Sequence, residues 1–168
     1  TSFDKGDSFI NSKVNMRGSL RVNDFTYVRQ DGDLLLFAAS NKGLLVSRDI
    51  GSSWFPFSDI EKKIDGAYLY NFTSNLQNPK NLFVALEKDG KGYVYRSDDA
   101  FFTVEKIFED KEKVLALEMR DQELYMGMSD GRLLSYNINK KTFKLEASSE
   151  EPIERLLLDD NQSVYVSD

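Results

Sequence analysis

The chain has 168 residues, 40% of them hydrophobic and 30% charged, which is typical of a single water-soluble globular domain with a sizeable core. No apolar run approaches the roughly 20 residues of a membrane span, and the first residues lack the charged and apolar regions of a signal peptide. The net charge of -6 disfavours a nucleic-acid partner, and a chain without Cys or His has no thiol nucleophile, disulfide, imidazole base or common zinc ligand set.

Short apolar runs recur along the chain with a regular spacing. Four runs of one pattern begin at residues 36, 82, 124 and 164, so they are 46, 42 and 40 positions apart: Leu36–Ala39, Leu82–Ala85, Leu124–Gly127 and Val164–Ser167. Polar turns separate further short runs around each of them, and no helical period is convincing. A period of about 40–45 residues is typical of one β-propeller blade. The sequence therefore predicts an all-β chain of four-stranded antiparallel blades.

These units divide the chain as one β-propeller segment. Blades are expected at about 22–58, 64–108 and 113–147, with the last strand of a preceding blade at 1–15 and the first two strands of a further blade at 152–168. An arc of about four blades would expose apolar faces and strand edges at both ends. We therefore expect a larger ring whose remaining blades complete these edges. A closed four-bladed ring is the less favoured alternative, because the third strand of the shared blade is missing.

One eight-residue motif marks the expected turns between third and fourth strands. The pattern S-x-D-x-G-x-[ST]-[WF] occurs at 2–9 and 47–54, a third copy at 97–104 lacks the Gly and the aromatic residue, and a fourth at 135–143 has Asn in place of Asp. Asp and Ser side chains can bond the backbone amides of their own turn, Gly51 can adopt a positive φ, and Trp54 can anchor the next strand. A turn stapled by its own side chains is therefore favoured over a catalytic carboxylate cluster.

The motif resembles the Asp-box, or BNR repeat, of β-propeller proteins. Sialidases, sortilin-type (Vps10) sorting receptors and bacterial photosystem-assembly-factor (Ycf48-like) propellers carry similar repeats. In such propellers the turns lie on the face away from the active site. The resemblance thus implies a structural role for ten residues, which are Ser2, Asp4, Gly6, Phe9, Ser47, Asp49, Gly51, Trp54, Ser97 and Asp99. It transfers fold better than function.

These features favour a non-catalytic ligand-binding, protein-binding or assembly module that is extracytoplasmic, whether periplasmic, secreted or lumenal. One alternative is a glycoside hydrolase of the sialidase or xyloglucanase type, with catalytic residues partly outside this chain. Another is the lumenal ligand-binding propeller of a sorting receptor. Sialidases grip sialate with three arginines, and no Arg of this chain stands in the expected sequence context. We therefore assign no catalytic residue, no metal site and no cofactor.

Blade geometry predicts where a ligand would bind. Loops from second to third strands, and links between blades, gather at one mouth of a propeller, while Asp-box turns lie at the other end. The residues expected on these binding-face loops are Lys42, Asp89, Lys91, Asp130 and Arg132. The three basic ones could form a patch for an acidic peptide or glycan, although such loop charges are more often simply solvated. The expected partner is a protein or a glycan.

Two N-glycosylation sequons begin at Asn71 and Asn161. They would carry glycans in a secreted eukaryotic protein. Asn71 ends an apolar strand, which disfavours its use.

Overall fold

The structure is a computed structural model that describes residues 11–30, 32–57, 64, 66–75, 78–159 and 163–167. The described chain is all-β, as predicted. Its strands are β1 (Lys13–Val14), β2 (Val22–Gln30), β3 (Asp33–Ser40), β4 (Gly43–Ser47), β5 (Ser53–Pro56), β6 (Tyr68–Asn75), β7 (Asn78–Lys88), β8 (Lys91–Ser97), β9 (Glu105–Asp110), β10 (Val114–Arg120), β11 (Glu123–Met128), β12 (Arg132–Asn137), β13 (Thr142–Ser148), β14 (Arg155–Leu158) and β15 (Val164–Ser167). None of the described residues belongs to a helix that is long and apolar enough to cross a membrane.

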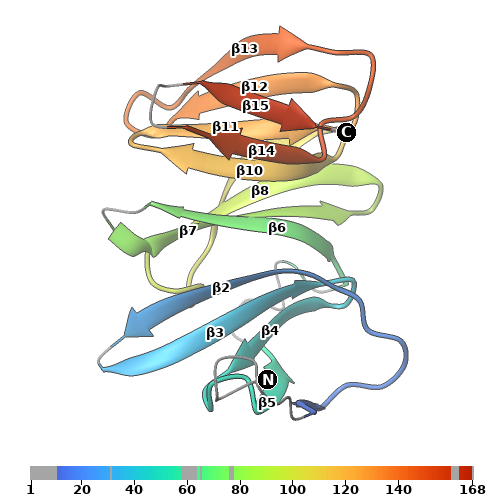
Figure 1. The fold of residues 1–168 in the computed structure, drawn as a ribbon, viewed down its shortest axis with the longest axis vertical. Coiled ribbons are helices and arrows are strands. Elements are labelled where there is room, and N and C mark those ends of the chain that lie inside the picture. The colour runs from blue at the N-terminus through green and yellow to red at the C-terminus, as the bar shows by residue number, and fades with distance from the viewer. Residues whose placement is uncertain are drawn as a thin grey trace.

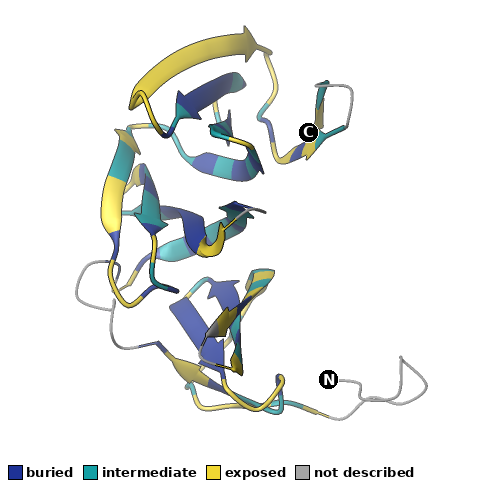
Figure 2. Ribbon diagram, turned by 90° about the vertical axis from the view of Figure 1, so that its left-hand side faces the viewer, coloured by how far each residue is buried: buried dark blue, intermediate teal, exposed yellow. Residues whose placement is uncertain are grey.

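Each group of consecutive strands forms one antiparallel sheet (Figure 1). We call β2–β5 the first blade, β6–β9 the second blade, β10–β13 the third blade and β14–β15 the C-terminal hairpin. Strand order follows chain order within every blade, so each is a simple meander. The sheets succeed one another along an open arc with the hairpin at its end (Figure 2), which is the predicted partial β-propeller.

The first described strand lies elsewhere than expected. Lys13 and Val14 pair in parallel with Ser53 and Trp54, so β1 adds a fifth strand to the outer edge of the first blade rather than belonging to a preceding one. The Lys13 amide donates to the Ser52 carbonyl at 2.9 Å. The reason is physical, since the outer edge of β5 offers unpaired backbone groups that another strand can satisfy. The first copy of the motif, at 2–9, lies outside the described residues.

Successive side chains of the middle strands enter different cores. In β7, Leu82 and Val84 pack into the interface between the first and second blades, whereas Phe83 and Ala85 pack into the interface between the second and third. This follows from the two-residue period of a strand, which sends neighbours to opposite faces. Near-continuous apolar runs, rather than alternating ones, are therefore the mark of a sheet covered on both faces.

An aromatic cluster fills the first interface. The ring of Phe37 on β3 lies 5.4 Å from that of Phe57 and 5.3 Å from that of Phe101, in edge-to-face contacts. Phe101 also contacts Phe72 on β6, with ring centroids 5.6 Å apart. Phe37 and Phe101 are fully buried. These contacts join both blades through rings that bury a large apolar area.

Hydrogen bonds between adjacent inner strands add to this packing. The inner strand of each blade has an irregularity in its pairing at the same place, and in the first two blades the next residue bonds the neighbouring blade. Asp24 accepts a hydrogen bond from the amide of Phe72 at 2.8 Å, and Asn71 accepts one from the amide of Leu117 at 2.8 Å. Asn71 also donates to Asp24, so its side-chain amide is engaged on both atoms. The third blade has Ala116 at the equivalent position and cannot repeat the bond.

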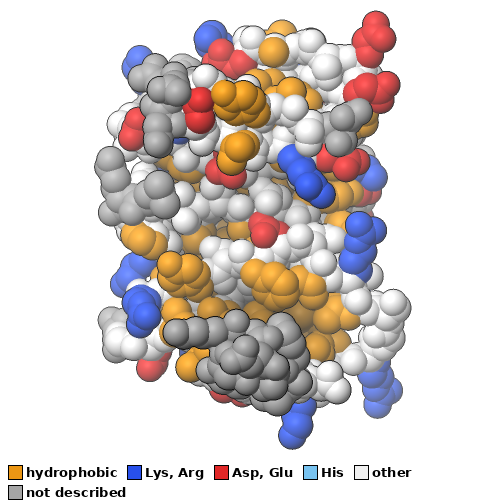
Figure 3. All heavy atoms as spheres, viewed as in Figure 1, with side chains coloured by type: hydrophobic (Ala, Val, Ile, Leu, Met, Phe, Trp, Pro, Cys, Tyr) orange, Lys and Arg blue, Asp and Glu red, His pale blue; other side chains and the backbone are white. Residues whose placement is uncertain are grey.

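Apolar side chains are exposed to solvent at both ends of the arc. Phe25 and Tyr27, on the inner strand of the first blade, are 61% and 63% exposed. Figure 3 shows hydrophobic side chains gathered over this blade. At the other end, Leu157, Tyr165 and Val166 of the hairpin are exposed. Both faces are the kind that a neighbouring blade would cover in a propeller.

Trp54 is buried, being 8% exposed, on the face of the first blade that points away from the second. It packs with Ala38 and Leu45, and Met16 and Leu20 of the preceding link cover the cluster. We predict that Trp54→Ala lowers the free energy of unfolding by about 3–5 kcal/mol, because truncation leaves a cavity. Urea denaturation measures the loss.

The neighbouring Phe55, 48% exposed, is the control, and Phe55→Ala should cost clearly less. An unchanged melting temperature for Trp54→Ala would show that the cluster does not support the blade.

Gly92 permits a close approach between the second and third blades. A Cβ at this position would lie 2.2 Å from the carbonyl oxygen of Glu112, in the link that leads to the third blade. We predict that Gly92→Ala destabilises the protein by about 1–3 kcal/mol, because backbone rather than a flexible side chain must move. Thermal denaturation tests this, with the exposed link residue Lys111→Ala as control. Equal melting temperatures for the two variants would contradict the close contact.

Candidate functional site

Two turns between third and fourth strands share one hydrogen-bond pattern. In the first blade, Ser47 Oγ accepts a bond from the Gly51 amide at 2.8 Å, and Asp49 Oδ1 accepts one from the Ser53 amide at 2.8 Å. The hydroxyl of Ser47 donates to Asp49 Oδ1, and that of Ser53 to Asp49 Oδ2. The side chains of Ser47, Asp49 and Ser53 are thereby bonded inside their own turn.

The second blade repeats the pattern without the glycine. Ser97 Oγ accepts from the Phe101 amide at 2.8 Å and Asp99 Oδ1 from the Thr103 amide at 2.8 Å. Ala100 and Phe101 adopt positive φ angles of 60° and 67°. Such angles are costly for residues with a side chain. Burial of the Phe101 ring between the blades offsets the strain, so the aromatic anchor missing from the end of the motif reappears at its glycine position.

The fourth copy of the motif does not form this turn. Ser47 and Ser97 stand opposite Leu36 and Leu82, whereas in the third blade Tyr136, not Ser135, stands opposite the equivalent Leu124. A shift of one residue turns a strand side chain to the other face of the sheet. The Ser135 hydroxyl accordingly donates to Glu146 on β13, at 2.7 Å.

Asp49 and Asp99 make the stability of these turns depend on pH. Hydrogen bonds from the side chain and amide of Ser53 lower the pKa of Asp49 below its ordinary 3.8. For Asp99, burial acts to raise the pKa, but bonds from Thr103 and Ser97 lower it overall. A pKa lowered by folding stabilises the protein above the unfolded pKa, and that stabilisation is lost as the pH falls below it.

The opposite end of the blades carries the five residues predicted on binding-face loops. They lie in or beside the turns between second and third strands, and ion pairs or hydrogen bonds hold the three basic side chains. Lys91 Nζ lies 2.7 Å from Glu109 Oε1, and Arg132 Nη2 lies 3.0 Å from Asp110 Oδ2. Lys42 Nζ donates to the carbonyl of Arg17 at 2.9 Å. The Arg132 bond joins the third blade to the second, so an ion pair connects neighbouring blades at this end, which we call the rim.

The ion pairs of the rim also set the charge state of Glu109. Hydrogen bonds from Lys106 and Lys91 lower the pKa of its carboxyl to about 2. Asp130 pairs with Arg132 at 2.7 Å, and Asp89 is an exposed residue of the turn before Lys91. The rim is thus largely neutralised and does not present one continuous basic patch.

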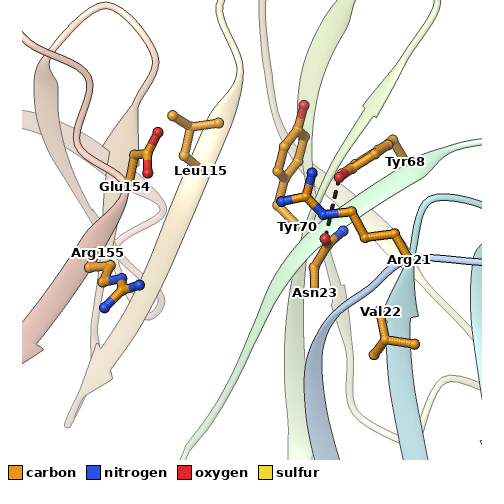
Figure 4. Close-up of a pocket in the computed structure, with 8 residues that line it drawn as sticks. All are labelled: Arg21, Val22, Asn23, Tyr68, Tyr70, Leu115, Glu154 and Arg155. Carbon is orange, nitrogen blue, oxygen red and sulfur yellow. Dashed lines mark hydrogen bonds between the residues drawn. The ribbon is translucent and has the colours of Figure 1, made fainter. Parts of the chain in front are cut away.

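A recess of about 410 Å³ opens where the inner strands begin. Its walls come from the N-terminal ends of β2, β6, β10 and β14 and the residues just before them, so four successive sheets contribute (Figure 4). The lining residues are Arg21, Val22, Asn23, Tyr68, Tyr70, Leu115, Glu154 and Arg155. Because a concave recess with polar groups is the usual form of a ligand site, we take this mouth recess as the candidate functional site.

Most neutral polar groups of the mouth recess are held in place by hydrogen bonds. The Tyr68 hydroxyl donates to Asn23 Oδ1 at 3.3 Å, and Asn23 Nδ2 donates to the carbonyl of Leu69 at 2.6 Å. The Tyr70 hydroxyl donates to Glu87 at 2.8 Å, and Lys113 lies 2.9 Å from the same carboxylate oxygen. The wall is therefore ordered before any ligand arrives.

The same contacts determine how the wall titrates. Burial, together with the bond to Glu87, raises the pKa of Tyr70, so its phenol stays protonated. Bonds from Lys113 and Tyr70 lower the pKa of Glu87, which stays ionised. Neither group is placed to change charge near neutral pH, and Glu154 is the single carboxylate among the eight lining residues. In the described part of the chain, moreover, no group of three or more Asp and Glu side chains is arranged to hold a metal ion.

None of the lining residues is among the five predicted on the binding-face loops, although Arg21, Val22 and Asn23 belong to a link between blades of the kind expected at the mouth. The predicted loops lie around the mouth, whereas the recess is formed by the starts of the inner strands. A signal existed in the repeat alignment, because the bulged positions of β2, β6 and β10 are Asn23, Tyr70 and Leu115. Residues at one repeat position must converge near the axis of a propeller.

We predict that the double variant Asp49→Asn, Asp99→Asn is less stable than the wild type at pH 7 and loses less stability on acidification. In each Asn, an amide nitrogen replaces one carboxylate oxygen and cannot accept a hydrogen bond from Ser53 or Thr103. The amide also does not titrate, so its contribution does not change with pH. Urea denaturation between pH 7 and pH 2 checks both effects. Asp89→Asn, in an exposed turn, is the control. Parallel stability curves for the double variant and the wild type would contradict the role of these carboxylates.

No protein-family model and no curated protein sequence matches this chain. Solved structures do resemble it. It is similar to the extracellular domain of a putative hybrid two component system, BT3049, from B. thetaiotaomicron, with a TM-score of 0.67, 16% identity and coverage of 90% of this chain and 22% of that one. The extracellular domain of the putative one component system BT4673 from the same organism has a TM-score of 0.65, 9% identity and coverage of 86% and 20%.

Another solved structure gives a third comparison. The chain is similar to the β-propeller domain of Cps50 (Swd1) from Myceliophteria thermophila, with a TM-score of 0.59, 13% identity and coverage of 86% of this chain and 48% of that one. The chain spans only about one fifth of the length of the two bacterial domains. At these identities the likeness shows the fold, which is that of a β-propeller.

Proposed function

We propose that this chain is a non-catalytic binding module that takes a protein or glycan ligand at the mouth recess. The observation that carries the proposal is the contrast between the two ends of the blades. At the Asp-box end, serine, aspartate and backbone groups bond one another inside each turn. At the mouth, four sheets bring aromatic and charged side chains to one recess. Ligand sites favour such a convergence of polar groups on a rigid scaffold.

Three further features of the proposal concern the location of the chain, its repeat family and the rest of the ring. Two of the similar structures are extracellular domains of putative signalling systems, which supports an extracytoplasmic place for this chain. The motif pattern and the paired turns at Ser47 and Ser97 support membership of the Asp-box propellers. The exposed apolar faces of the first blade and the hairpin support completion by further blades of the same ring.

A glycoside hydrolase is the less favoured function. Hydrolysis by the usual route needs two carboxyl groups that face each other across the bond to be cleaved. The recess is lined by Glu154 alone among carboxylates, and the nearby Glu87 is bonded to Tyr70 and Lys113. The described residues of this chain offer no second partner at the recess.

Arrays of defined glycans and peptides test the proposal with three proteins. The wild type should bind a ligand, Tyr68→Ala should lose at least tenfold in affinity, and Arg48→Gln, at the Asp-box end, should bind as the wild type does. The protein should release no product from a panel of chromogenic glycosides. Product release, or binding that depends on Arg48 and not on Tyr68, would contradict a non-catalytic mouth site.

A further inference from the structure

Three charged side chains of the mouth recess have no partner of opposite charge. Within the described part of the chain, Arg21, Glu154 and Arg155 take part in no ion pair, and their side chains make no hydrogen bond. The neutral groups of the wall, by contrast, are bonded to one another. Recognition at this recess therefore falls to the charged groups, which are the ones still able to form strong bonds with a ligand.

A second recess shows what a satisfied surface looks like in the same protein. It has about 400 Å³ and lies on the face of β11–β13. There Ser135 and Lys144 both bond Glu146, and Asn137 bonds Glu123. Three of its four charged side chains, Glu123, Lys144 and Glu146, are thus bonded within the recess. In the mouth recess, by contrast, none of the three charged side chains is bonded in this way.

The two arginines approach the mouth recess from different sheets. Arg21 precedes β2 of the first blade, and Arg155 begins β14 of the C-terminal hairpin. In Figure 4 the guanidinium of Arg21 lies beside Tyr70, and Arg155 lies on the other side of the recess with Glu154 and Leu115. Two positive groups that line one cavity repel each other, and an anion between them would replace that repulsion by two attractions.

From this arrangement we propose that the mouth recess binds a small carboxylate ligand of the sugar-acid class, held between Arg21 and Arg155. The inference rests on the proposed function and narrows it to a glycan component. Guanidinium groups match the planar, two-oxygen geometry of a carboxylate. Glu154 then accepts hydrogen bonds from ligand hydroxyl groups, and the rings of Tyr68 and Tyr70, in tilted contact with centroids 4.7 Å apart, form the apolar wall.

Charge selects a small ligand over an acidic macromolecule. The chain has a net charge of -6, so a long polyanion would be repelled by the rest of the surface. Two arginines against one glutamate leave the recess with a single excess positive charge. This suits one carboxylate. The volume of about 410 Å³ also falls at the lower end of the range of about 300–1,000 Å³ for small-molecule sites.

Isothermal titration calorimetry at low ionic strength tests this with D-glucuronate as the probe, glucose as its uncharged counterpart and succinate as a carboxylate without hydroxyl groups. Glucuronate should bind, glucose should bind at least tenfold more weakly, and added salt should weaken glucuronate binding. Arg21→Gln and Arg155→Gln should each reduce the affinity roughly tenfold or more. Arg29→Gln, an exposed arginine farther along β2, should change it less than twofold.

Glu154→Gln tests the proposed contact of Glu154 with the ligand hydroxyl groups separately from the contact of the arginines with the ligand carboxylate. It should strengthen succinate binding, because a negative charge is removed, and should narrow the preference for glucuronate over succinate. All the substituted side chains are exposed, so the variants should keep the melting temperature of the free protein, which a thermal scan checks.

Equal affinities for glucuronate and glucose, no measurable binding of glucuronate, or arginine variants that bind as the wild type does would each overturn the sugar-acid proposal. A ligand from the arrays that is lost in Tyr68→Ala but kept in both arginine variants would overturn it too, while leaving the mouth site itself intact.

Discussion

The structure depends on one constraint, which is that each sheet of a blade has two faces and must bury both. Phe37 shows how this is met, because its ring packs against Phe57 of its own blade and Phe101 of the next. In β7, successive apolar side chains alternate between the interface with the first blade and the interface with the third. A blade therefore buries these side chains only against its neighbours, so the arc is the unit in which they leave water.

That stacking gives the two ends of the blades different chemical characters. At one end a turn closes within a single blade, so its polar groups can be satisfied locally, as Ser47 and Asp49 do. At the other end the chain crosses from blade to blade, and its bonds are long-range. Arg132 binds Asp110 of the preceding blade, and Lys113 binds Glu87. The inner strands begin at this end, where they converge, and this convergence creates the recess between Arg21 and Arg155.

Several features of the chain were predictable because they depend on local pattern. The spacing of the runs at Leu36, Leu82 and Leu124 predicted repeated sheets, and the structure confirms an all-β arc of four-stranded blades. Register was harder to predict. Ser135 fits the motif by sequence, yet the pairing of β12 with β11 places Tyr136 where the motif needs serine. The fourth copy matches the motif only with one inserted residue, so the sequence does not show a shift of one residue in strand pairing. Such a shift places the side chain on the opposite face of the sheet.

By itself, then, the sequence determined the strand period, the apolar character of both blade faces and the side-chain-bonded turns, since each arises from residues within about ten positions of one another. Only the tertiary structure decided which charges are neutralised. Lys91 and Arg132 find carboxylates about twenty residues away and become part of the rim, whereas Arg21 and Arg155, 134 positions apart in the chain, meet at one recess without a partner. The physical reason is that the stacking of successive blades brings distant strand starts together around one axis. The local sequence pattern does not indicate which side chains then face each other.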